Sequence, residues 1–206
     1  TGLLVEKPLL EKILKRCQEL DILMAVDECF LDFVPSPEKY TLKEYLETYD
    51  NLFLLKAFTK RYAMAGVRLG YGLCGNKGLL RKMEGVCQPW NVSSMAQAAG
   101  LAALQEREYV EKGRQVTFQE LAYLKEELAA LGYPVYPSQA NYVFFTGPAD
   151  LYEKLEQKKI LIRDCSNYTG LSQGYYRVAV KKHEENQQLV RALKEIDRTK
   201  VENVIL

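Results

Sequence analysis

The feature that most constrains the fold is an alternation, in the first half of the chain, of short apolar runs with helical stretches. The apolar runs have the length and composition of buried strands and cover residues 22–26, 52–57 and 69–74. The helical stretches have an amphipathic spacing or a capping residue and cover residues 9–20, 42–48, 76–85 and 93–112. This order of elements predicts an α/β fold with a mostly parallel sheet and helices.

The pattern changes near Gly113. A long amphipathic helix is expected to end at Gly132, because glycine readily takes the positive φ that follows many helices. After it we expect a strand, a helix, two strands and a helix, over residues 142–145, 149–158, 160–163, 175–180 and 184–196. We therefore predict two domains, with residues 1–112 forming part of an α/β domain and residues 113–206 a small α+β domain.

Charge and composition exclude several classes of protein. The chain has 206 residues, and its 28 basic and 27 acidic side chains leave a net charge of +1, which gives no bulk attraction to nucleic acid or to anionic membranes. No apolar stretch approaches the roughly 20 residues of a membrane span. Five scattered cysteines without a CxxC pair, together with one histidine, predict no metal site. Such cysteines indicate reduced thiols, and we expect a cytoplasmic protein.

The amino terminus has the character of an internal position. Thr1 and Gly2 include no initiator methionine and no signal-peptide core, and an amphipathic helix follows within a few residues. A natural N-terminus usually has several residues before the first packed helix or strand. We therefore expect a fragment that lacks an upstream part, with a processed or renumbered terminus as the alternative.

Three charged side chains follow the predicted strands or the connection between them: Asp27, Lys60 and Arg68. Because the carboxyl ends of parallel strands share one edge of a sheet, we expect them to converge. A phosphorylated aldehyde cofactor such as pyridoxal phosphate needs a lysine for the Schiff base, a carboxylate to keep the pyridine nitrogen protonated and an arginine for the phosphate. By spacing alone, a solvated lysine and a helix-capping aspartate remain the simpler alternatives.

Longer stretches around these residues resemble a known family. Ala25-Val-Asp-Glu-Cys-Phe30 resembles the Asp-Glu strand end, and Lys56-Ala-Phe-Thr-Lys-Arg-Tyr-Ala-Met-Ala-Gly-Val-Arg-Leu-Gly-Tyr71 the Schiff-base loop, of fold-type I pyridoxal phosphate enzymes of the class I/II aminotransferase family. Thr1-Gly2 resembles the end of the family's Asn-Pro-Thr-Gly loop. The resemblance extends over the whole chain. It implies pyridoxal 5'-phosphate as cofactor, residues 1–112 as the C-terminal part of the cofactor-binding large domain and residues 113–206 as the small C-terminal domain.

The resemblance also assigns roles in the cofactor site. It implies that Lys60 is the catalytic residue and forms the Schiff base, and that Asp27 pairs with the pyridinium. Arg68 and the Thr59 hydroxyl would contact the cofactor phosphate.

Residues 160–171 and 176–180 in the second half, together with residues 88–97, resemble threonine-phosphate decarboxylases. This implies decarboxylation of O-phospho-L-threonine to (R)-1-amino-2-propanol phosphate in cobalamin biosynthesis. Arg177 would hold the substrate carboxylate and Arg163 the substrate phosphate. The alternatives for the two arginines are that Arg177 simply pairs with an acid and that Arg163 forms an ion pair with the adjacent Asp164. The alternatives are a histidinol-phosphate-type aminotransferase and a non-catalytic pyridoxal phosphate-sensing regulatory domain.

Two residues depart from the family pattern. Phe30 stands where the family often has a tyrosine that donates to the cofactor's ring oxygen, and Ala57 stands where a hydroxyl often contacts the phosphate. The upstream parts of the family's site are also absent from these residues, so we expect the chain alone to be inactive. For the full-length protein we expect a homodimer that acts on a small phosphorylated amino acid, with no nucleic-acid or membrane partner.

Four other residues have a structural interpretation. We expect Trp90 to serve in packing and not in a cofactor contact. We also expect Cys29 and Cys165 to be small buried residues and not nucleophiles, because nothing nearby in the sequence marks a reactive thiol. His183 is expected to be an exposed residue at the start of a helix.

Overall fold

In the computed structural model, the structure describes residues 2–204, and the side chains of residues 2–197. Thr1, which belongs to the Thr-Gly resemblance, lies outside the described residues. The chain divides into two compact units, Leu4–Lys112 and the part from Gly113 onward together with Gly2 and Leu3. Gly2 belongs to the second unit because its carbonyl accepts the backbone N–H of Gln139 at 2.8 Å.

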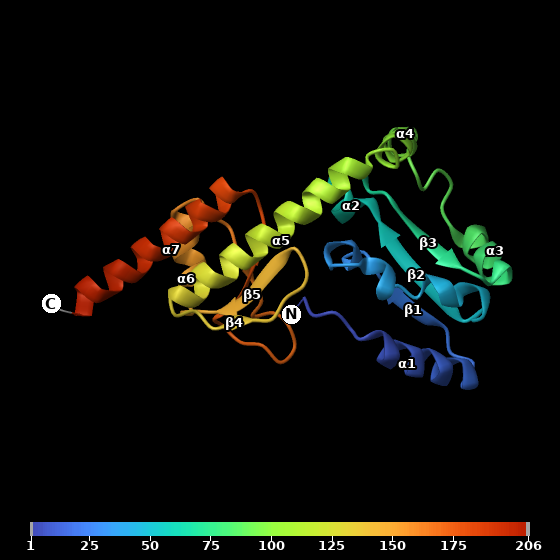
Figure 1. Ribbon diagram of the computed structural model, residues 1–206, viewed down its shortest axis with the longest axis horizontal. Coiled ribbons are helices and arrows are strands. Elements are labelled where there is room, and N and C mark those ends of the chain that lie inside the picture. The colour runs from blue at the N-terminus through green and yellow to red at the C-terminus, as the bar shows by residue number, and fades with distance from the viewer. Residues whose placement is uncertain (1, 205–206) are drawn as a thin grey trace. The chain divides into compact units, whose positions relative to one another are not determined.

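The first unit is built on a three-stranded sheet in the order β1 (Met24–Asp27), β2 (Leu52–Ala57), β3 (Gly70–Cys74). The β1–β2 pair is parallel, as expected, whereas β3 runs antiparallel to β2, so that this part of the sheet is mixed (Figure 1). A parallel connection needs a crossover of a dozen or more residues, usually a long helix. Here the connection contains only α2 (Phe58–Arg61) and a 3-10 turn, η4 (Ala65–Val67), and the chain folds straight back.

One face of this sheet carries the core of the first unit. The predicted amphipathic helix is confirmed as α1 (Lys7–Glu19), which packs there with the 3-10 helix η3 (Lys43–Glu47). The predicted α-helix after Thr41 is therefore a 3-10 helix, although the Thr41 hydroxyl does accept the Lys43 N–H at 3.2 Å. The buried core residues are Leu14, Met24, Leu42, Leu52 and Leu54.

Two helices follow β3, and each has the cap that its sequence predicts. Asn76 caps α3 (Lys77–Val86), and Ser93 caps α4 (Ser94–Ala103). Figure 1 shows α4 and α1 on opposite sides of the sheet. The single helix expected up to residue 112 is wrong, because short i→i+3 hydrogen bonds end α4 and α5 (Arg107–Ala130) begins after them.

The connections of the first unit contain the remaining short elements and Trp90. The 3-10 turns η1 (Leu31–Phe33) and η2 (Pro37–Lys39) lie between β1 and η3. The packing role expected for Trp90 is wrong, since its own backbone has positive φ and its side chain is 95% exposed.

The second unit contains a four-stranded antiparallel sheet in the order β4-β5-β7-β6. The strands are β4 (Val135–Tyr136), β5 (Tyr142–Thr146), β6 (Arg163–Asp164) and β7 (Tyr175–Ala179). The short strand β4 gives no periodic signal in the sequence and was not expected.

The strand expected over residues 160–163 is displaced toward the C-terminus and shortened to β6. After α6 (Leu151–Gln157), the backbone at Lys159 has positive φ, and the Ile160 N–H donates to the Leu155 carbonyl at 2.9 Å. The apolar residues 160–162 therefore complete the end of the helix before pairing begins.

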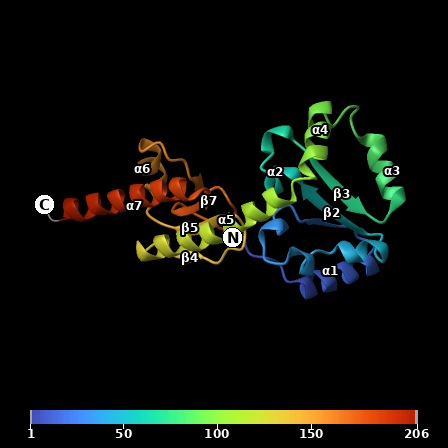
Figure 2. The ribbon, with the colours of Figure 1, turned by 45° about the horizontal axis from the view of Figure 1, so that its top comes forward.

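Three helices cover one face of the second sheet. They are α5, α6 and α7 (His183–Val204), and α5 and α7 run alongside each other, joined by a 2.8 Å ion pair between Glu127 and Lys194 (Figure 2). Alternate residues of β5 and β7 point into this core, as the period of a strand requires. The fully buried side chains include Leu124, Leu128, Val143, Phe145, Leu151, Leu155, Tyr176 and Leu193.

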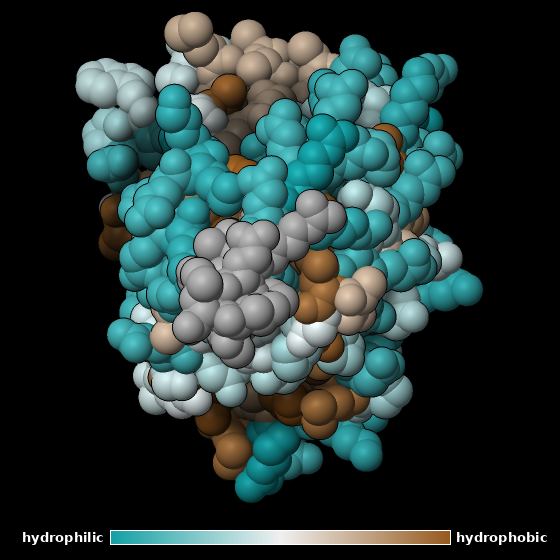
Figure 3. All heavy atoms as spheres, turned by 90° about the vertical axis from the view of Figure 1, so that its left-hand side faces the viewer, coloured by the Kyte–Doolittle hydropathy of each residue, from teal (hydrophilic) through white to brown (hydrophobic). Residues whose placement is uncertain are grey.

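The face of the molecule in Figure 3 is mostly hydrophilic, with hydrophobic side chains in small patches. Among the described residues, no helix has both the length and the apolar character that crossing a membrane requires.

Candidate active site

Asp27 ends β1, beside Leu55 of β2. Side chains alternate along a strand, so Asp27 points away from the face that α1 and η3 cover. Its carboxylate accepts the Cys29 N–H at 2.9 Å, and the side chain is exposed. The aspartate thus closes a turn at the strand end, with its side chain exposed to solvent.

Lys60 lies in α2, a single helical turn directly after β2. The turn is held by Phe58, which is buried and stacks on Tyr62 at a centroid distance of 5.1 Å. Lys60 itself is exposed, and its ammonium nitrogen lies 5.5 Å from the centroid of the Phe30 ring. The structure therefore brings Lys60 next to the segment that follows Asp27.

Arg68 reaches the same region through the backbone. The neighbouring Leu69 carbonyl accepts the Phe58 N–H at 3.1 Å, which ties the start of β3 to α2. Arg68 has a left-handed backbone, and its guanidinium donates to the Ala65 carbonyl at 3.0 Å. Thr59 is half-buried, and within the described part of the chain its hydroxyl has no hydrogen-bond partner.

The chemistry of these groups fits pyridoxal phosphate. Among the residues whose side chains are described, Asp27, Lys60 and Arg68 form no ion pair with one another or with other residues. An exposed carboxylate, amine and guanidinium, together with the Thr59 hydroxyl, are the partners that a pyridine nitrogen, an aldehyde and a phosphate require.

Sequence reasoning missed the buried carboxylate beside Asp27. Glu28 is only 4% exposed and accepts from the Lys56 ammonium at 2.7 Å, from the Thr41 hydroxyl at 2.8 Å and from the Leu42 N–H at 2.9 Å. The signal available in the sequence was an acid directly after an apolar strand, with a lysine near the end of the next one.

Cys29 lies between these two acids. Burial, followed by the hydrogen bond and charge of Asp27, raises the pKa of the Cys29 thiol to about 12. Its half-buried position and neutral thiol agree with the packing role expected for it. Cys165 is likewise buried, and burial raises the pKa of its thiol.

In the second unit, Arg163 of β6 and Arg177 of β7 are direct cross-strand partners. The Arg177 guanidinium lies 4.6 Å from the centroid of the Tyr142 ring, and that of Arg163 lies 5.8 Å from the Tyr168 ring. Two like charges directly opposite each other on a sheet repel. An anion bound between them would relieve this repulsion.

The ion pair considered for Arg163 does not form. Asp164 points to the other face of its strand and accepts from the Ser166 N–H at 2.8 Å and the Ser166 hydroxyl at 2.9 Å. Among residues 2–197, neither Arg163 nor Arg177 has a carboxylate partner. Arg163 instead contacts the Asn167 side chain at 3.4 Å.

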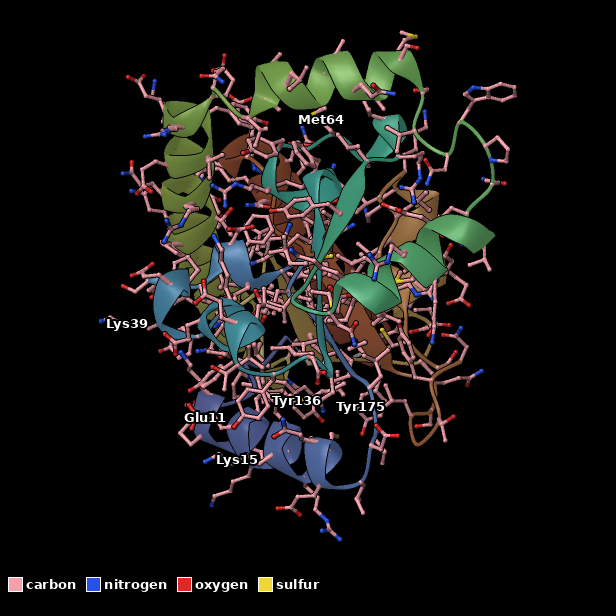
Figure 4. All side chains as sticks on the ribbon, turned by 90° about the vertical axis from the view of Figure 1, so that its right-hand side faces the viewer. Glu11, Lys15, Lys39, Met64, Tyr136 and Tyr175 are labelled. Carbon is pink, nitrogen blue, oxygen red and sulfur yellow. The ribbon has the colours of Figure 1, made fainter. Side chains whose placement is uncertain are left out.

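The same face of this sheet carries aromatic rings. Tyr136 and Tyr175 stack at a centroid distance of 6.3 Å, and both pack on Phe144 of the strand between them (Figure 4). The exposed Arg163 and the half-buried Arg177 therefore border an aromatic surface that is away from the helices.

His183 begins α7, as expected, but it also has a partner that the sequence did not reveal. Its Nδ1 lies 3.0 Å from a carboxylate oxygen of Glu120, whose other oxygen accepts from the buried Asn186 side chain at 2.8 Å. This network joins α5 to α7. Among the described residues, no three histidine, cysteine, aspartate or glutamate side chains gather as a metal site would need.

The model of the class I and II aminotransferase family matches residues 1–193 of this chain. The chain belongs to this family. Its enzymes use pyridoxal phosphate, in agreement with the cofactor expected from the site residues. The fold agrees as well, since the histidinol-phosphate aminotransferase of Clostridium acetobutylicum superposes with a TM-score of 0.91 at 30% identity, over 97% of this chain and 61% of that one.

Curated relatives carry two different activities. The threonine-phosphate decarboxylase of Salmonella typhimurium is 36% identical over 95% of this chain and 54% of its own length. The histidinol-phosphate aminotransferase of Nitratidesulfovibrio vulgaris is 37% identical over 84% of this chain and 47% of its own length. The chain thus spans about half the length of the relatives that it matches, and similarity alone favours neither activity.

Proposed function

We propose that the protein to which this chain belongs is a pyridoxal phosphate-dependent decarboxylase of O-phospho-L-threonine. The product would be (R)-1-amino-2-propanol phosphate, an intermediate of cobalamin biosynthesis. The observation that carries this proposal is the cross-strand pair Arg163 and Arg177, which has no carboxylate partner among the described residues. A substrate with one phosphate and one carboxylate supplies an anion for each arginine.

Each candidate site residue of the first unit has one role in this proposal. When bound, the cofactor supplies an aldehyde for covalent attachment and a ring that takes up an electron pair. Lys60 offers the amine for that attachment, Asp27 keeps a proton on the ring nitrogen, and Arg68 with Thr59 binds the phosphate.

The second unit supplies the substrate's orientation. Arg177 would hold the substrate carboxylate and Arg163 the substrate phosphate. The bond between Cα and the carboxylate breaks, CO₂ leaves, and Cα takes up a proton in its place. The choice of the bond that breaks depends on how the carboxylate is held, and small displacements change such rates strongly.

An aminotransferase of the histidinol-phosphate type is the second candidate, because the chain also resembles enzymes of that name in sequence and in fold. The test is to purify the protein at its natural length from its source, supply pyridoxal phosphate and O-phospho-L-threonine, and quantify CO₂ and pyridoxamine phosphate together. CO₂ with little pyridoxamine phosphate supports the decarboxylase. Pyridoxamine phosphate without CO₂, and turnover of histidinol phosphate, would replace it with the aminotransferase. The natural-length protein is further proposed to be a homodimer.

A further inference from the structure

Two ion pairs join the segment after β1 to the segment that carries Lys60. Glu28 pairs with Lys56 at 2.7 Å, and Asp32 pairs closely with Arg61. In both pairs the acid comes from the segment after β1 and the base from the end of β2 or from α2. We call these two ion pairs the clamp.

The first ion pair of the clamp is buried on the covered face of the sheet. Glu28 lies directly after β1, and Lys56 lies in β2. By the alternation of side chains along a strand, both point to the face that α1 and η3 cover, and their side chains are 4% and 17% exposed. Glu28 is also held by the Thr41 hydroxyl and the Leu42 N–H. A buried carboxylate with three donors has one orientation, so this pair fixes the ends of β1 and β2 against each other.

The second ion pair acts on α2 itself. This helix has four residues, too few to be stable without outside contacts. Its buried side chain, Phe58, holds its first residue, and the pair of Arg61 with Asp32 holds its last. The Arg61 and Asp32 side chains are 40% and 14% exposed, so this pair is open to substitution without disturbing the core.

In the sequence, Lys60 lies between the two bases of the clamp. The Phe30 ring, which the Lys60 ammonium contacts, lies in the sequence between the two acids. We propose that the Glu28–Lys56 and Asp32–Arg61 ion pairs position the Lys60 amine for attachment to the cofactor aldehyde. These four are positioning residues, because the side chain that reacts is that of Lys60. The inference rests on the proposed role of Lys60.

The test measures how fast Lys60 captures pyridoxal phosphate in the natural-length protein. At timed intervals, borohydride reduction locks the cofactor onto the amine, and peptide mapping quantifies the adduct at Lys60. Arg61→Gln and Asp32→Asn are each expected to slow capture about tenfold, because misplacement of a reacting group costs rate. The charge-swapped double variant, Arg61→Asp with Asp32→Arg, is expected to recover the rate to within about twofold.

Lys7→Gln is the matched control, since it breaks the Lys7–Glu44 ion pair of the same unit, which joins α1 to η3 and involves no residue of β1, β2 or α2. Melting temperatures are recorded for every variant. Capture at the unaltered rate in the single variants, a folded swap variant that stays slow, or equal slowing by Lys7→Gln would each overturn the proposal. If the unaltered protein forms no adduct at Lys60, the proposed function fails instead, and the two failures remain distinct.

Discussion

The Lys60 ammonium nitrogen lies 5.5 Å from the centroid of the Phe30 ring, so the amine that would attach the cofactor faces a hydrocarbon ring. At this position the family often supplies a tyrosine hydroxyl, which Phe30 lacks. This distance is in the range of a cation–π interaction, which holds the Lys60 side chain without a hydrogen bond from its ammonium group.

Phe30→Tyr is expected to tighten cofactor binding. The added hydroxyl supplies one hydrogen bond to the cofactor's ring oxygen, worth about 1 kcal/mol or about fivefold in affinity. Spectroscopic titration of the natural-length protein with pyridoxal phosphate measures the change. Phe33→Tyr, a buried phenylalanine in the adjoining 3-10 turn, is the control and should give no gain. An unchanged Kd in Phe30→Tyr would show that the ring does not face the cofactor.

Cys29 is expected to resist alkylation. Iodoacetamide reacts with the thiolate, and a rise of the pKa from 9.0 to about 12 lowers the thiolate fraction near neutral pH by about a thousandfold. Because the folded protein favours the neutral thiol, the protection of Cys29 from alkylation is complete below pH 9 and is lost as the pH rises toward 12. Mass spectrometry at pH 8 should find the exposed Cys87 modified and Cys29 intact. Equal labelling of both cysteines would contradict the raised pKa of the Cys29 thiol.

Arg163→Gln is expected to weaken anion binding and slightly stabilise the fold. It removes one of two like-charged side chains at cross-strand positions, and relief of their repulsion is worth about a few tenths of a kcal/mol. Thermal unfolding at low salt checks the stability, and titration with O-phospho-L-threonine checks the binding. Because salt screens exposed charges, the stabilisation should disappear near 1 M salt. A fall in melting temperature would mean that Arg163 has a structural partner.

Leu14→Ala is expected to lower the free energy of unfolding by about 2–5 kcal/mol, because the side chain is 1% exposed in the core of the first unit. Leu9→Ala, in the same helix and 52% exposed, should cost less than about 1 kcal/mol. Urea unfolding followed by circular dichroism compares the two. Equal losses would contradict the packing of α1 on the sheet.

The sequence was most informative where one local signal decided the structure. The apolar run of β2 begins after the polar Asp50 and Asn51 and was located to the residue, and Asn76 and Ser93 cap the helices that follow them. It failed where tertiary contacts decide. The antiparallel direction of β3 depends on the short connection through α2, and the end of α4 depends on two i→i+3 hydrogen bonds, donated by Gln105 and Glu106, that no composition signal marks.

The sequence predicted which residues form the candidate site, but not which contacts their neighbours make. Asp27, Lys60 and Arg68 follow from spacing and family resemblance, and their roles stay predictions. The burial of Glu28 and the opposition of Arg163 to Arg177 required strand registers that a sequence does not supply. The bond between Glu120 and His183 joins helices that are far apart in the chain, so no local pattern indicates it.

The central claim is that Lys60 is the amine that holds the cofactor, and peptide mapping after borohydride reduction of the natural-length protein tests it directly. The prediction is a single adduct at Lys60 at stoichiometric pyridoxal phosphate, lost in Lys60→Ala and unchanged in Lys39→Ala, an exposed lysine of the same unit (Figure 4). An adduct spread over several exposed lysines, or one that persists in Lys60→Ala, would contradict the account.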